Sequence, residues 1–572
     1  MQGKDPGIFA CLPDLQTRKY ESMLRGIISV LMFCLPSFIP LFSQSSLTVP
    51  PGRPKLIVGI VVDQMRYDYI YRYWDKFGEG GFRRLIDEGT FCKNARFSYL
   101  NTYSATGYAT ISTGSMPASH GIIADEWYRR LQKERIYCTQ DDGVRAVGGS
   151  YENGMHSPVH LVATTLGDEL RMYFNMRSKV FGVGMKEHAA ILSAGHTANA
   201  AYWFDASTGT WMSSTWYLDS LPEWVSEFNE KEFPGLYLER KWEPLYPAES
   251  YTESLPDSCG YETGLGGRNV FPYDLDHLSR VRRRERDYSL LGSVPFGNTY
   301  TKDFAVSLIV SEKLGEDEFP DLLTVAFNPP GEVGKLFGPN SMEMQDVYLR
   351  LDRDLEHFLE FLDRQVGKKN VLVYLTSNHG VSASPAYLET LRVPGGFLNL
   401  NGAVALLRAY LNVMYGNGNW VDAVVDQQIF LNRQLIEDSK LSLEEVQNRV
   451  ARFMVQISGV AQAVTSTTLE SNYFGSGMLQ RIQNGYNQKR SGDVILSLEP
   501  GWIFRNGDVS RNSSAYRYDS HVPLVWYGWK IPRTVISDPV DMTGIASTMA
   551  FLMNISYPNG NMEEPIPGLI SR

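Results

Sequence analysis

Four short apolar runs stand out along the chain because polar residues interrupt them so little. The first, residues 56–62, is rich in β-branched side chains and ends at Asp63. The others are residues 322–327, 370–375 and 522–527. Runs of this length and composition predict strands that are buried on both faces, as in a parallel sheet.

Between these runs the apolar spacing changes to that of amphipathic helices. One helical pattern covers residues 67–89, and another covers residues 156–171. Ser341 opens a long helix before the strand at 370–375, and the apolar residues on one of its faces are Val347, Leu351, Leu355, Phe358 and Leu362. Strand, helix and strand in this order form a βαβ unit, so the sequence predicts an α/β fold with parallel strands.

Two polar features lie where an α/β sheet of this kind would carry a ligand-binding site. Asp63 follows the first strand, at the edge where open α/β sheets bind ligands, but it could equally cap the next helix. Residues 101–122 are dense in hydroxyls and glycines and put Ser104 and Thr106 near the start of a helix. The helix dipole and free N–H groups there attract phosphate. A simple helix cap remains the favoured local interpretation of both hydroxyls.

Composition limits the kinds of partner. The chain has 572 residues, 43% of them hydrophobic and 21% charged, with a net charge of −10 and no long basic run. A nucleic-acid partner held by phosphate neutralisation is therefore not expected. The length suits one α/β domain with insertions. We expect it to span residues 45–572, with cap insertions around 195–300 and 385–501, where the pattern becomes irregular.

Residues 1–44 are predicted to be a leader and signal peptide. Arg25 precedes a 17-residue apolar run and a polar exit, which is the order found in secretory signals. Pro36 and Pro40 interrupt the run, so a membrane-spanning segment is not predicted. Translation could begin at Met1 or at Met23, because the residues before Met23 do not resemble a signal.

The motifs, taken in order, resemble the alkaline phosphatase superfamily, in particular the secreted monomeric bacterial phosphatases related to nucleotide pyrophosphatases/phosphodiesterases. The resemblance extends from Lys55 to Trp529. It implies an alkaline-phosphatase-like three-layer α/β/α sandwich, a monomer, and a periplasmic or secreted location in a bacterium. The matching stretches are VVDQMRYDY, YSATGYATISTGSMPASHGI, SPVHLVATTLGDEL, AGHTANAAYWFD, VGKLFGPNSMEMQDVYLRLDRDL, VYLTSNHG and YDSHVPLVWYGW.

Enzymes of this family use two zinc ions, one to activate a hydroxyl nucleophile and one to stabilise the leaving oxygen. The resemblance puts Ser104 at the nucleophile, where the family usually has threonine. It puts Lys186 at a catalytic lysine that also binds substrate. The implied metal ligands are Asp63, Ser104, Asn378, His379 and His521.

Several positions depart from the family pattern. Asn378 replaces an aspartate ligand, and Gly331 and Lys335 replace the aspartate and histidine of the second zinc. A zinc site left with one histidine of three ligands should not hold zinc at useful affinity. The Lys335 ammonium could supply part of the lost charge, in which case its Nζ should reach His521 or Ser104. At most one divalent ion is expected, either zinc or a harder ion such as Mg²⁺ or Ca²⁺.

The implied substrate-binding positions change as well. Lys186 matches the family, but Asp125 stands where the phosphatases carry asparagine, and His188 replaces an arginine. Both changes make the pocket less favourable for a phosphate dianion.

Two functional interpretations follow. We favour an exported family member with a degraded two-zinc site and weak or no phosphatase activity. The alternative is an active metal-dependent phosphomonoester or phosphodiester hydrolase that uses Ser104 as nucleophile with one metal and takes a small phosphate ester as substrate. A third hypothesis, a carbohydrate- or envelope-binding module, has no specific motif behind it.

Overall fold

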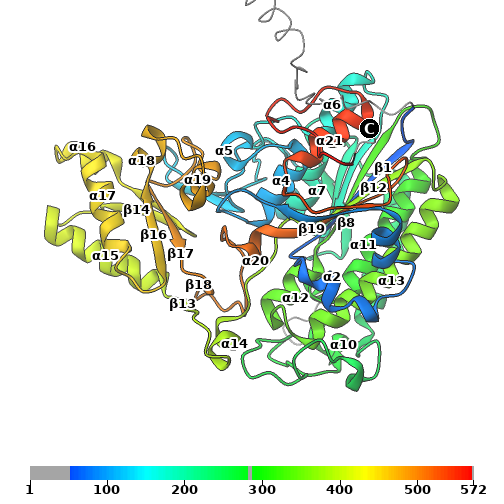
Figure 1. The fold of residues 1–572 in the computed structure, drawn as a ribbon, viewed down its shortest axis with the longest axis horizontal. Coiled ribbons are helices and arrows are strands. Elements are labelled where there is room, and N and C mark those ends of the chain that lie inside the picture. The colour runs from blue at the N-terminus through cyan, green and yellow to red at the C-terminus, as the bar shows by residue number, and fades with distance from the viewer. Residues whose placement is uncertain (1–51, 281–285, 570–572) are drawn as a thin grey trace, which may run out of the picture. The chain divides into compact units, whose positions relative to one another are not determined.

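The structure is a computed structural model that describes residues 52–280 and 286–569 (Figure 1). The predicted leader and signal peptide, residues 1–44, lies outside the described residues. Among the helices within the described ranges, none combines the length and apolarity that a membrane span requires.

An 11-stranded sheet forms the centre of the fold. Its middle strand is β1 (Leu56–Val62), which pairs in parallel with β11 (Asp321–Phe327) on one side and β12 (Val371–Thr376) on the other. The parallel arrangement continues through β6 (Val180–Gly184) and β7 (Ala200–Asp205). The predicted α/β fold with a mostly parallel sheet is confirmed.

The remaining part of the sheet is mixed. β19 (His521–Gly528), which contains the fourth apolar run, pairs antiparallel with β12 and with β2 (Thr90–Arg96). Two short strands, β20 (Thr534–Ile536) and β21 (Val540–Asp541), add to β2 in parallel. At the opposite edge, β8 (Thr210–Ser214) and β5 (Ala146–Val147) pair antiparallel. β7 and β8, which lie within 195–300, belong to the central sheet, and the cap insertion expected in this region stays a prediction.

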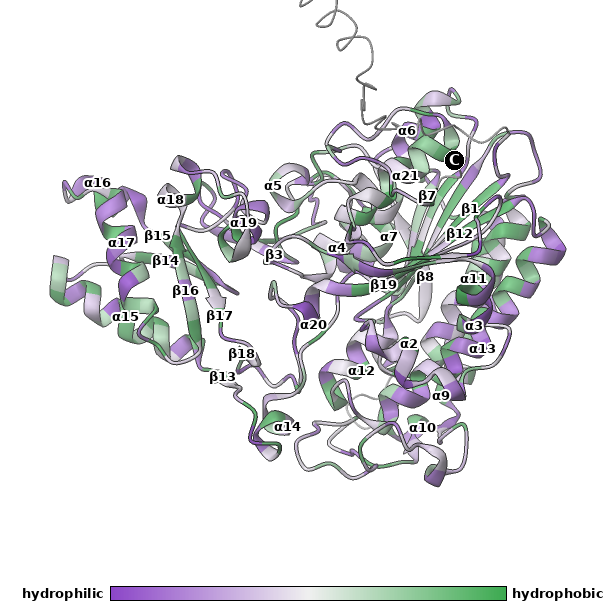
Figure 2. Ribbon diagram, viewed as in Figure 1, coloured by the Kyte–Doolittle hydropathy of each residue, from purple (hydrophilic) through white to green (hydrophobic). Residues whose placement is uncertain are grey.

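Helices cover both faces of the sheet, because alternate side chains of its buried strands enter different cores. Leu56, Val58, Ile60 and Val62 pack in one core with α11 (Phe296–Ser311) and α13 (Met342–Gln365). Ile57 and Val61 pack in the other, with α4 (Ser104–Thr113), α7 (Glu187–Ala194) and α21 (Gly544–Met553). The central strands are accordingly coloured largely as hydrophobic in Figure 2. This is the predicted three-layer α/β/α arrangement.

Two of the predicted helices have different bounds. The pattern at 67–89 is broken into α2 (Asp68–Arg72), a 3₁₀ turn (Trp74–Lys76) and α3 (Phe82–Glu88). The break occurs because Asp352 accepts hydrogen bonds from the backbone N–H groups of Gly78 and Phe82. The helix predicted at 156–171 is confined to α6 (Leu166–Tyr173), which begins at a capping box formed by Thr165 and Asp168.

A second, four-stranded sheet lies within residues 385–501 and has its own core. Two helices, α15 (Leu400–Tyr415) and α17 (Leu443–Met454), contribute to that core. That this region acts as a cap over the site stays a prediction. The strands, in spatial order, are β14 (Val421–Val425), β15 (Gln428–Leu431), β17 (Val494–Leu498) and β16 (Val460–Thr465).

Candidate active site

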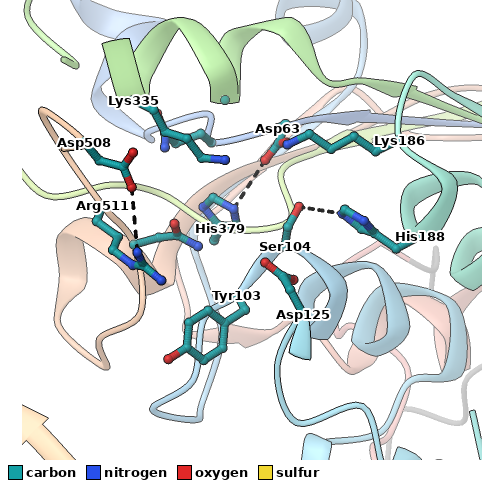
Figure 3. A pocket seen from close by; sticks show the side chains of 13 residues that line it. Asp63, Tyr103, Ser104, Asp125, Lys186, His188, Lys335, His379, Asp508 and Arg511 are labelled. Atoms are coloured by element: carbon teal, nitrogen blue, oxygen red, sulfur yellow. Dashed lines mark hydrogen bonds and ion pairs between the residues drawn. The ribbon is translucent and has the colours of Figure 1, made fainter. Parts of the chain in front are cut away.

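A cavity of about 110 Å³ lies at the carboxyl end of β1 (Figure 3). Parallel neighbours in a sheet end at the same edge, so the residues that follow them meet there. Asp63 follows β1, His379 follows β12, and Lys186 follows β6. The predicted positions that line the cavity are Asp63, Ser104, Asp125, Lys186, His188, Gly331, Lys335 and His379.

Asp63 is the centre of the polar contacts and is 2% exposed. Its Oδ1 accepts a hydrogen bond from Asn378 Nδ2 at 2.9 Å and lies 3.3 Å from His379 Nε2. Its Oδ2 lies 3.3 Å from Lys186 Nζ. Burial opposes ionisation, but Lys186, His379 and Asn378 outweigh it and hold the pKa of Asp63 well below its usual range. Asp63 is therefore a carboxylate already neutralised by side chains of this chain.

Lys186 links Asp63 to a second carboxylate, Glu332. Lys186 Nζ lies 2.6 Å from Glu332 Oε1, and Lys335 Nζ lies 2.9 Å from the same oxygen. Burial raises the pKa of Glu332, but the charges of Lys186 and Lys335 outweigh it and lower that pKa to about 2. The pKa of Lys186 is raised well above its ordinary value, since both carboxylates outweigh the effect of burial. Glu332 was not predicted from the sequence, although its i,i+3 spacing from Lys335 on α12 (Pro329–Phe337) is a recognisable pairing signal.

The orientation of Asn378 determines what it can do. Its Oδ1 accepts a hydrogen bond from the backbone N–H of Gln64 at 3.2 Å. Its amide nitrogen therefore points the other way, donating to Asp63 and, at 2.8 Å, to Ser104 Oγ. An amide nitrogen in this position is a hydrogen-bond donor and not a metal ligand. Asn378 thus occupies the predicted place but presents the wrong atom for coordination.

Ser104 is the first residue of α4 and is 7% exposed. Its Oγ lies 3.2 Å from His188 Nε2. Asp125 Oδ1 accepts a hydrogen bond from the backbone N–H of Ala105 at 2.8 Å, so Asp125 stabilises the start of α4. Thr106, by contrast, donates its hydroxyl to the backbone carbonyls of Asn101 and Tyr103. Neither hydroxyl caps α4, so the helix cap favoured for them above is wrong.

His521 lies apart from this group. Its Nε2 donates to the carbonyl of Lys93 at 2.9 Å, and its ring stacks on Tyr67 with the centroids 4.1 Å apart. It begins β19, where it pairs with Arg96, and it does not line the cavity. The structure therefore does not bring His521 together with Asp63 and His379. The expected contact of Lys335 with His521 or Ser104 is replaced by its ion pair with Glu332.

Sequence analysis also missed a loop that lines the cavity ahead of β19. It contributes Asp508, Arg511 and Asn512. Arg511 pairs with Asp426 at 2.7 Å and lies 3.7 Å from Asp508. The polar run RNGDVSRNSS, which three residues separate from the YDSH motif, was the available signal.

Comparison with known proteins identifies the family. A model described as "Type I phosphodiesterase / nucleotide pyrophosphatase" matches residues 57–521. The chain belongs to this family. Alkaline phosphatase PhoV of Synechococcus elongatus is 38% identical over 519 residues, which are 91% of this chain and 93% of PhoV.

Alkaline phosphatase PafA of Elizabethkingia meningoseptica is 38% identical over 535 residues, which are 93% of this chain and 96% of PafA. The crystal structure of wild-type PafA has a TM-score of 0.87 and covers 92% of this chain and 100% of its own. The predicted place in the alkaline phosphatase superfamily is confirmed.

Two observations describe which metal donors the site offers. Within the described ranges, no cluster of three or more His, Cys, Asp or Glu side chains could hold a metal ion. At Gly331, a Cβ atom would lie 2.7 Å from both Cγ and Oδ2 of Asp63. An aspartate therefore cannot be accommodated at 331 unless α12 or Asp63 moves.

This close approach predicts the effect of adding one methyl group. Gly→Ala within a helix ordinarily stabilises a protein by up to about 1 kcal/mol. We expect Gly331→Ala to destabilise this one by about 1–2 kcal/mol, because Asp63 is held on three sides and cannot yield. Urea unfolding measures the change. Gly292→Ala is the control, since a Cβ there meets no heavy atom within 4 Å. Equal effects of the two substitutions would contradict the prediction.

A pH dependence is predicted for Asp519, which is buried beside the loop that carries His379. Its backbone carbonyl accepts from Gly380, and its Oδ2 accepts from the N–H and hydroxyl of Ser514. Burial raises its pKa from 3.8 to about 7, although Ser514 and His379 lower it. Between about pH 4 and pH 7 the carboxyl of Asp519 therefore keeps its proton in the native protein and loses it in the unfolded chain. Its contribution to stability is complete below pH 4 and is lost as the pH rises through 7.

Asp519→Asn removes this proton equilibrium. We expect the variant to exceed the wild type in unfolding free energy by on the order of 2 kcal/mol at pH 8, with the difference shrinking towards pH 4. Urea unfolding across this range measures it, with the exposed Asp87→Asn as control. A difference that stays constant with pH would contradict the assignment.

Proposed function

We propose that this protein is an exported member of its family in which two-zinc phosphoester hydrolysis is weak or lost. The observation that carries the proposal is the Asn378 amide nitrogen, which donates to Asp63 Oδ1 at 2.9 Å. It presents a hydrogen-bond donor where a family enzyme would offer zinc a carboxylate. Gly331 and Lys335, at the positions of two further ligands, support the same conclusion.

The charges of the cavity also oppose a phosphate dianion. Each cation that lines it already has a carboxylate partner: Lys186 and Lys335 share Glu332, and Arg511 pairs with Asp426. A dianion would have to compete for cations that are already neutralised, and it would approach Asp125. Phosphate monoesters should therefore bind weakly.

The test is metal analysis together with turnover. The purified chain is treated with EDTA, returned to buffer with Zn²⁺, Mg²⁺ or Ca²⁺, and analysed for bound metal. It is then assayed with aryl phosphate mono- and diesters, and PafA prepared in the same way is the positive control. We expect no stoichiometric metal and no turnover above the Ser104→Ala variant. Metal-dependent turnover that Ser104→Ala abolishes would overturn the proposal.

The second candidate function, a hydrolase with one metal ion, rests on a single distance. Asp63 Oδ1 and His379 Nε2 are 3.3 Å apart. That is about the separation of two ligands that share one zinc at bonds of about 2.0–2.1 Å. One bound ion per chain with turnover in the same assay would favour this candidate.

A further inference from the structure

A row of hydrogen-bonded side chains extends from Ser104 away from Asp63. Ser104 Oγ lies 3.2 Å from His188 Nε2, and His188 Nδ1 lies 2.5 Å from the Tyr137 hydroxyl (Figure 3 shows the Ser104–His188 pair). Glu187 Oε1 also lies 3.8 Å from His188 Nδ1. The two-zinc chemistry of the family does not account for this row.

The directions of these hydrogen bonds decide whether His188 can act as a base. Asn378 Nδ2 donates to Ser104 Oγ, so the serine proton is free to point at His188 Nε2. Base catalysis requires the tautomer in which Nε2 is unprotonated and Nδ1 donates its proton to the oxygen of Tyr137. Glu187 Oε1, 3.8 Å from Nδ1, favours a proton on that nitrogen. In an activated nucleophile, the hydroxyl donates its proton to an imidazole nitrogen. Further groups orient the imidazole through its other nitrogen.

The surroundings of Ser104 favour charge on its oxygen. Ser104 and His188 are 7% and 4% exposed, so little water competes for their hydrogen bond. The hydroxyl lies at the first residue of the ten-residue helix α4, and the helix dipole favours negative charge there. The hydrogen bond from Asn378 also lowers the cost of negative charge on Oγ.

The charges of the cavity indicate the class of ester. With the cations that line it already paired, the cavity offers a dianionic phosphate no uncompensated positive charge. An uncharged carboxylic ester has no such requirement, and its carbonyl carbon can be attacked without a metal ion.

We infer that Ser104 is the nucleophile and His188 the general base of a metal-independent acyl transfer from uncharged carboxylic esters. Ser104 Oγ attacks the carbonyl carbon while its proton passes to His188 Nε2. The ester C–O bond breaks as His188 returns that proton to the leaving oxygen, which departs as an alcohol. Water then attacks the acyl-serine through the same base, releasing the carboxylic acid and restoring Ser104.

Tyr137 and Glu187 are positioning residues. The inference builds on the proposed function only in assuming that zinc is not needed.

The experiment uses the full chain in EDTA and two probes, an alkyl fluorophosphonate and p-nitrophenyl acetate. Mass spectrometry of the labelled protein is expected to find one adduct, on Ser104, and none in Ser104→Ala. His188→Gln is expected to slow labelling by about 10²-fold or more. His277→Gln, an exposed histidine on α10 (Leu275–Arg280), should label like the wild type. Thermal melting of each variant establishes that it is folded.

Tyr137→Phe separates positioning from folding. We expect kcat for p-nitrophenyl acetate to fall about fivefold to tenfold, the worth of one hydrogen bond, with KM unchanged. Unchanged kcat would refute the role of Tyr137. Folded wild-type protein without an adduct on Ser104, or labelling of His188→Gln at the wild-type rate, would overturn the inference. Zinc-dependent phosphatase activity would overturn the proposed function alone, because labelling in EDTA is measured separately.

Discussion

Lys186→Met is expected to lower the unfolding free energy by about 3 kcal/mol at pH 7, the range found when one partner of a buried ion pair is removed. Lys186 touches two carboxylates, and its side chain is 23% exposed while Asp63 is 2% exposed. Without the ammonium group, Asp63 and Glu332 lose the charge that lies between them. Methionine keeps most of the volume, so the loss reports charge and not packing. Urea unfolding measures it.

The pH dependence of this loss has a definite sign. The pKa values of Asp63 and Glu332 are depressed in the folded protein, in the case of Glu332 to about 2. The stability they contribute is present above their unfolded pKa values, near 4, and disappears as the pH falls towards 2. The difference between Lys186→Met and wild type should therefore shrink in acid.

The matched control is Lys335→Met. Lys335 contacts only one of the two carboxylates, Glu332, and its side chain is 37% exposed, so its removal should cost less than about 1 kcal/mol. If both variants lose the same stability, Lys186 is not the cation that holds the site together.

Asn378→Asp is expected to convert the site into one that responds to zinc. In EDTA the new carboxylate would face Asp63 Oδ1, which is 2.9 Å from the present amide nitrogen, and we expect a loss of about 2–4 kcal/mol from their repulsion. Zinc would relieve it, because the new carboxylate, Asp63, His379 and Ser104 form a plausible four-ligand set. Free zinc at 100 times its Kd should return about 2.7 kcal/mol.

Thermal unfolding with and without zinc, together with the number of zinc ions bound per chain, measures this response. Asn378→Ala is the control, since it removes the same two hydrogen bonds without supplying a ligand. A variant Asn378→Asp that binds no zinc would refute our placement of these ligands around Asp63 Oδ1.

The fold could be predicted because its signals are local. The run from Leu56 to Val62 predicts a doubly buried strand by composition alone, and Ser341 with its periodic apolar residues predicts α13. One of the two misplaced helices had a distant cause. Asp352, about 270 positions from Gly78 and Phe82, binds the backbone that interrupts the pattern at 67–89.

The site was only partly predictable for the same reason. Asp63, Ser104 and His379 could be found because each follows a strand or begins a helix. The orientation of Asn378 depends on the N–H of Gln64, a contact that no spacing encodes. His521 adjoins a matching motif, yet sheet pairing with β2 directs it to Lys93. Tyr137 comes from a separate element, β4 (Glu134–Tyr137), and only the folded chain brings it to His188.

The contact between Gly331 and Asp63 also sets the order in which a zinc centre could be built. A carboxylate at 331 would collide with Asp63 while α12 lies this close, whereas Asn378→Asp exchanges an amide for a carboxylate of the same shape. Selection or design for a metal centre would therefore reach the one-metal protein, through position 378, before the two-metal one, which needs α12 to move.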